Sequence, residues 1–215
     1  MNSSSQLDRL LEAGVADAAG ISAAELAAHA CALPDEPGTM LAVHPSLVPA
    51  RGLAPLLRHH DKPGFVVEDM TDLEQFVPIA AVRIPDRPLY LIHDVDRGDA
   101  MRNWTPDEAL PAITERGRTP LTVNEGISWL LQEPKMLEPN YCFMTIGSRK
   151  AKGQGYDART PAVWISRGPA ATAPIARAHP RWAGAGPATV IPGSASPPPS
   201  TAATRLSAAA GQPPQ

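Results

Sequence analysis

The sequence predicts an α+β fold: a mixed or antiparallel sheet with packed helices, short helices before it and a disordered tail after it. Three observations support this prediction. Apolar residues recur at helical spacing over residues 5–33. Short apolar, β-branched runs then occur in blocks, and do not alternate strictly with helices. Proline, alanine and glycine dominate residues 169–215. With 215 residues and 43% hydrophobic content, the chain can form one domain with a core.

Two short helices are expected at the start of the chain. The second begins at Ser22, which is followed three residues later by Glu25, the spacing of a capping box. It ends before Pro34, because proline cannot continue a helix. Residues 34–50 are rich in proline and are interpreted as a connecting segment. Residues 1–63 are therefore predicted to form an N-terminal helical and connecting segment.

Residues 64–168 carry the signals of the α+β core domain. Thr105 caps a helix that has proline in its first position, and Thr122 with Glu125 forms a second capping box. The polar insert 147–161 predicts a long mobile hairpin loop. Short apolar runs predict strands at five places, which are residues 65–67, 77–82, 89–93, 141–146 and 162–165.

The C-terminal residues 169–215 have a different composition. After Arg167 the chain contains no aspartate, glutamate or lysine, and bulky apolar residues are rare. Such a segment cannot bury enough apolar surface to offset the entropy of ordering its backbone. We therefore expect it to be disordered. The proline run at 197–199 lacks the adjacent basic residue that an SH3-type ligand would carry, so disorder is the preferred interpretation.

Composition also restricts partners and location. The net charge is −3 and the isoelectric point is about 6.1, so neither nucleic acid nor a membrane surface is an expected partner. Cys31 and Cys142 lie far apart and fit no zinc motif. The N-terminus lacks a signal-peptide pattern, and no apolar run reaches the roughly 18 residues of a spanning helix. These features predict a cytoplasmic protein.

The best candidate for a site is the acidic turn that follows the apolar run 89–93. Asp94, Asp96 and Asp99 can supply carboxylates for a divalent metal ion, and Trp104 follows closely enough to wall a pocket. The other interpretation is that these aspartates shape a turn and pair with neighbouring arginines. We favour the turn, because no second catalytic or metal-binding motif accompanies it.

Two classes of function therefore stay open. The first is a non-catalytic domain that binds a small ligand or a protein through the acidic turn and Trp104. The second is a metal-assisted hydrolase or transferase that uses Asp94, Asp96 and Asp99 with a divalent metal ion. The sequence has no nucleophile elbow, P-loop, dinucleotide fingerprint or zinc-protease motif, which favours the first class.

The stretch 65–168 resembles an uncharacterised family of bacterial proteins that is common in high-GC Gram-positive, actinobacterial-type genomes. The resemblance rests on long strings of residues, including DVDRGD at 94–99, GRTPLT at 117–122 and PAVWIS at 161–166. It implies one bacterial domain of unknown function and transfers no mechanism.

The chain departs from that family's pattern near its end. Members typically continue with Gly-Trp-Cys-Trp-Ala-Gly-Asn, whereas residues 181–189 read RWAGAGPAT. Read one base earlier, the codons of this segment permit Leu-Gly-Trp-Cys-Trp-Ala-Gly-Asn. We therefore hypothesise that the tail is a frameshifted reading of the family's last strands, with the shift between Gly168 and Arg177.

Overall fold

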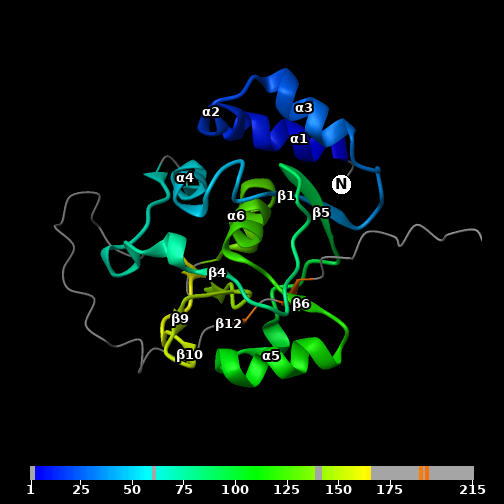
Figure 1. Cartoon of the computed structure of the whole chain (residues 1–215). Helices are drawn as coiled ribbons and strands as arrows, with labels where there is room; N and C mark the ends of the chain where they lie inside the picture. The colour runs from blue at the N-terminus through cyan, green and yellow to red at the C-terminus, as the bar shows by residue number, and fades with distance from the viewer. Residues whose placement is uncertain (1–2, 60–61, 139–141, 166–188, 191, 194–215) are drawn as a thin grey trace, which may run out of the picture.

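The computed structural model describes residues 3–59, 62–138, 142–165, 189–190 and 192–193, and it confirms the α+β fold. Three N-terminal helices lie together at one end of the molecule, α6 runs through the middle and α5 covers the opposite end (Figure 1). The helices are α1 (Ser3–Glu12), α2 (Val15–Ala19), α3 (Ala23–Cys31), α4 (Ala50–Leu53), α5 (Pro106–Glu115) and α6 (Val123–Gln132).

Three helices begin at the predicted N-caps, and all three have a capping box. Ser22, Thr105 and Thr122 each accept a hydrogen bond from the backbone N–H three residues later, and the glutamate at that position accepts one in return. Short 3₁₀ helices occupy several connections, which are η1 (Ala54–Leu56), η2 (Glu68–Met70), η3 (Leu73–Gln75), η4 (Asp99–Met101) and η5 (Pro134–Met136).

The strands form several small sheets. β1 (Thr39–Val43) pairs antiparallel with β5 (Leu89–His93), and β5 has the bounds that the sequence predicted. Other strands are two residues long and also pair antiparallel, namely β2 (Arg58–His59) with β3 (Lys62–Pro63), β4 (Val77–Pro78) with β8 (Ser148–Arg149), β9 (Ala151–Lys152) with β10 (Gly155–Tyr156), and β11 (Ala162–Val163) with β7 (Phe143–Met144). The predicted strand at 65–67 is absent, and the one at 77–82 is limited to β4.

Two strands of the predicted tail are described. β12 (Thr189–Val190) pairs parallel with β7, which makes that sheet mixed, and β13 (Pro192–Gly193) pairs antiparallel with β6 (Thr119–Pro120). At these four residues the structure differs from the expected disorder. The rest of that prediction, over residues 169–188, 191 and 194–215, lies outside the described residues.

β1 corrects the interpretation of residues 34–50 as a connecting segment. All five residues of this strand are buried. The helices α1 and α6 contact the strand, and β5 pairs with it along one edge. Gly38 before it has a φ of +76°, a conformation that glycine adopts without strain. The pairing of β1 with β5 also joins residues on both sides of the predicted boundary after residue 63.

Among the described residues, no strand pairs with the second edge of β1. Side chains cover this edge instead. Gln6 donates a hydrogen bond to the Thr39 carbonyl (2.8 Å) and accepts one from the Leu41 N–H (2.7 Å). Gln132 donates to the Leu41 carbonyl (2.6 Å). An uncovered strand edge would leave buried backbone groups unpaired, which costs free energy. These glutamines therefore fix α1 and the end of α6 against the sheet.

Trp129 and Trp164 differ in burial, and the 147–161 insert is only partly exposed. Trp129 is buried and its ring lies 5.7 Å from that of Phe143. Trp164 is 37% exposed and follows directly after β11. The insert holds the β9–β10 hairpin, but its residue Arg149 is buried and so is not part of a solvated loop.

Candidate functional site

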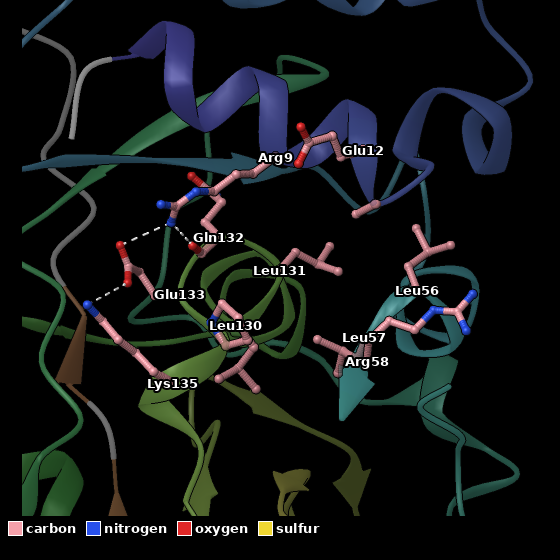
Figure 2. A pocket seen from close by; sticks show the side chains of 12 residues that line it. Arg9, Glu12, Leu56, Leu57, Arg58, Leu130, Leu131, Gln132, Glu133 and Lys135 are labelled. Carbon is pink, nitrogen blue, oxygen red and sulfur yellow. Dashed lines mark hydrogen bonds and ion pairs between the residues drawn. The ribbon is translucent and has the colours of Figure 1, made fainter. Parts of the chain in front are cut away.

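A cavity of about 470 Å³ lies between α1, the segment from η1 to β2 and the C-terminal end of α6 (Figure 2). Figure 2 looks along the axis of α6, so that the last turn of this helix faces the viewer. The cavity has the size of an ordinary small-ligand site. Its lining residues are Arg9, Glu12, Ala13, Leu56, Leu57, Arg58, Leu130, Leu131, Gln132, Glu133, Pro134 and Lys135.

Leucine side chains form the apolar wall of this cavity. Leu56 and Leu57 come from η1 and the residue after it, whereas Leu130 and Leu131 come from the last turn of α6. Leu56, Leu57 and Leu131 also pack against the largest core cluster, which holds them in place. The wall is thus continuous with the core on the protein side and apolar on the cavity side.

Charged residues occupy one rim of the cavity. The Arg9 guanidinium donates to the backbone carbonyl of Gln132 and lies 3.3 Å from the Glu133 carboxylate. Lys135 also pairs with Glu133, at 3.5 Å. Figure 2 shows these three contacts side by side at the end of α6. Arg9 therefore acts as a cationic cap on the C-terminus of a helix that is distant from it in sequence.

The end of α6 leaves hydrogen-bond acceptors unpaired. Pro134 has no N–H, so the Leu130 carbonyl lacks the donor that the next helical turn would supply. Among the described residues no N–H donates to the Leu130 or Leu131 carbonyl. Gln132 has no exposed surface, and its Oε1 has no partner within the described part of the chain. Because Gln132 is fully buried, this oxygen cannot be reached from the cavity.

The predicted acidic turn lies elsewhere in the fold, directly after β5. Asp94 has a positive φ of 48°; its N–H donates to the Gly38 carbonyl (3.1 Å), and its own carbonyl accepts from Arg118. Asp96 accepts a hydrogen bond from the N–H of Gly98 (2.6 Å). This is the local hydrogen bond by which aspartate stabilises a turn.

Asp99 is engaged by an arginine two residues before it. Arg97 donates two hydrogen bonds to the Asp99 carboxylate, at 2.8 and 2.9 Å, and these bonds lower the pKa of Asp99. Trp104 is 37% exposed and does not line the cavity of Figure 2. The contacts of Asp96 and Asp99 agree with the turn-shaping interpretation. Among the described residues no three His, Cys, Asp or Glu side chains are grouped to hold a metal ion, and the metal assignment stays a prediction.

Sequence reasoning missed the cavity. Its walls come from segments that are about 120 residues apart, and no motif joins Arg9 to Gln132. One signal was present: Pro134 directly after an amphipathic helix leaves carbonyls without donors. That signal locates a helix end but does not show what lies opposite to it.

The structure thus defines an α+β domain with a leucine-walled cavity at the end of its central helix. The chain belongs to the Family of unknown function (DUF5701), which it matches over residues 9–185. This match extends the resemblance at both ends of the stretch 65–168. No curated protein and no solved structure matches the chain. In the described part of the chain, none of the helices has the length and apolar character needed to cross a membrane.

Proposed function

We propose that this protein is a non-catalytic domain that binds a small molecule in the cavity at the end of α6. The observation that carries the proposal is the combination of an apolar leucine wall with a charged rim in one cavity of about 470 Å³. Small-ligand sites are mostly apolar and have a few polar groups that orient the ligand. The acidic turn after β5 keeps a structural role in this proposal.

The lining residues support binding more than catalysis. They include no serine, cysteine or histidine, so the serine or cysteine nucleophile and the histidine base of many hydrolases are absent from the lining. One of the two carboxylates, Glu133, is held in ion pairs by Arg9 and Lys135.

Binding can be tested with the neutral apolar dye N-phenyl-1-naphthylamine, whose fluorescence rises in an apolar site. The substitution Ala13→Phe places a ring in the cavity, since Ala13 lines it. We expect at least a tenfold loss of dye affinity in this variant. The matched control is Ala18→Phe, because Ala18 is exposed on α2 and does not line the cavity.

Two results would contradict the proposal. The first is the absence of saturable dye binding by the folded protein. The second is equal dye affinity in Ala13→Phe and Ala18→Phe, which would place the dye at another surface. Circular dichroism of both variants verifies that they are folded.

The remaining parts of the proposal concern source and location. We infer a cytoplasmic protein of a high-GC Gram-positive bacterium, which the family resemblance supports. The net charge of −3 supports the absence of a nucleic-acid partner. A gel-shift assay with duplex DNA and with RNA at low salt tests this part, and a shifted band would contradict it.

A further inference from the structure

We propose that the ligand of the cavity at the end of α6 is an amphiphilic anion, a single carboxylate or phosphate group carried on an apolar body. This inference rests on the proposed function and adds the chemical class of the ligand. It follows from the charges of the side chains that line the cavity and from the leucine wall beside them.

Cationic side chains outnumber carboxylates in the lining. The cations are Arg9, Arg58 and Lys135, and the acidic residues are Glu12 and Glu133. Arg9 and Lys135 both pair with Glu133, at 3.3 and 3.5 Å, so this group of three side chains has one positive charge in excess. A ligand with a negative head group therefore meets a net attraction at this cavity.

Arg58 is the cation that is available to a ligand. Its side chain is exposed, and it has no ion pair or hydrogen bond among the residues that the structure describes. Figure 2 shows it on the opposite side of the last turn of α6 from Arg9 and Lys135. A guanidinium presents its N–H donors in a planar fork that matches a carboxylate or a phosphate. Arg58 can thus hold an anionic head group without breaking an existing contact.

Two negative features of the cavity oppose an anion, and the effect of each is limited. The C-terminus of α6 carries a partial negative charge, but the Arg9 guanidinium donates to the Gln132 carbonyl and compensates this charge. Glu12 is exposed on α1, where water and salt screen its carboxylate. The same screening acts on Arg58, so each such charge is expected to change binding by only about threefold.

The leucine wall supplies most of the affinity. Leu56, Leu57, Leu130 and Leu131 offer apolar contact, so the body of the ligand is an alkyl or aralkyl group. Each methylene that enters the cavity is expected to tighten binding roughly fourfold, until the cavity is full. An apolar body between the leucines and an anionic head group at the exposed rim together define the amphiphile.

The test compares four probes of equal chain length by isothermal titration at pH 7 and low salt: octanoate, octyl phosphate, octan-1-ol and octylammonium. We expect at least one of the two anions to bind the full chain at least threefold more tightly than octan-1-ol, and octylammonium to bind more weakly than octan-1-ol. The two anions distinguish a carboxylate ligand from a phosphate ligand. Binding should be lost in Ala13→Phe and kept in Ala18→Phe, because only the first substitution fills the cavity.

Charge substitutions locate the head group. Arg58→Glu replaces an attraction by a repulsion, so it should weaken binding of the tighter anion about tenfold and leave binding of octan-1-ol unchanged. The matched control is Arg83→Glu, since Arg83 is exposed and does not line the cavity. This control changes the net charge by the same amount and should alter anion binding less than about twofold. Glu12→Gln should strengthen anion binding about threefold.

The outcomes separate the two proposals. If octan-1-ol or octylammonium binds as tightly as both anions and Ala13→Phe abolishes that binding, the cavity is a ligand site but the anion preference is wrong. If Arg58→Glu and Arg83→Glu change anion binding equally, Arg58 does not hold the head group and the inference is overturned. If none of the four probes binds, or if Ala13→Phe leaves binding unchanged, both the inference and the proposed function fall.

Discussion

Replacing Gly126 by alanine tests how tightly α6 is packed against β7. Gly126 lies in the middle of α6, where alanine is favoured over glycine by about 1 kcal/mol. The structure predicts the opposite sign. A Cβ atom at this position would lie 2.6 Å from Thr145 Cγ2 and 3.2 Å from Phe143 Cε2, whereas carbon atoms pack at about 3.5–4.0 Å.

Neither neighbour of Gly126 can move aside easily. Thr145 has no exposed surface, and both its N–H and its Oγ1 donate to the Pro161 carbonyl, at 2.8 and 3.1 Å. Phe143 is equally buried and packs on Trp129. Overpacking of a core costs about 1–3 kcal/mol, and the short contact places this site at the upper end. After the helix propensity gain, we expect a net destabilisation of about 1–2 kcal/mol.

Urea unfolding of four proteins measures this value: the unchanged chain, Gly126→Ala, Thr145→Ser and the double variant. Thr145→Ser removes Cγ2 and keeps the hydroxyl, so the double variant should be more stable than the sum of the two single effects predicts, by about 1 kcal/mol. Gly155→Ala is the control; no atom lies within 4 Å of its new Cβ, and its stability should stay within about 0.5 kcal/mol. The reasoning is refuted if Gly126→Ala is as stable as the unchanged chain, or if the effects of the two substitutions simply add.

Four further predictions concern titration, metal binding and the reading frame. Burial raises the pKa of Glu125, so the stability that this residue contributes is largest at acid pH and is lost as pH rises through the raised pKa. In Glu125→Gln, the free energy of unfolding measured in urea should therefore fall less between pH 4 and pH 8 than it does in the unchanged chain. The hydrogen bonds from Arg159 and Lys150 hold the pKa of Asp72 far below its usual range, so these bonds stabilise the fold at neutral pH and less so on acidification. The difference in unfolding free energy between the unchanged chain and Asp72→Asn should therefore shrink from pH 6 to pH 3. Because the acidic turn is expected to be structural, millimolar Mg²⁺, Mn²⁺, Ca²⁺ or Zn²⁺ should leave the melting temperature unchanged, and a rise that Asp94→Asn abolishes would restore the metal-dependent function. Sequencing the gene should reveal Trp-Cys-Trp in the shifted frame, and an early stop codon there would exclude the frameshift.

Local elements could be predicted because their signals lie within a few residues of one another. The capping boxes at Ser22, Thr105 and Thr122 join positions three residues apart, so one turn of helix brings the partners together. The turn at Asp96 is local in the same way, since its hydrogen bond reaches only Gly98. The residues of such segments therefore determine their conformation locally.

β1 could not be predicted on the same grounds. Its run of five buried residues is shorter than most helical patterns and lies between prolines, so the segment had the signals of a connection. It becomes a strand because β5 pairs along one edge and Gln6 and Gln132 satisfy the other. These partners lie up to 91 residues away, and the sequence alone does not show that they meet.

The sequence by itself determined the α+β class, three helix starts and the bounds of β5, because hydrophobic spacing and capping act over one or two turns of chain. Only the tertiary structure decided where the cavity lies. It brought Arg9 to the carbonyl end of α6 and placed Leu56 opposite Leu131. Such contacts depend on how all the helices pack together, and the order of residues along the chain does not reveal that packing locally.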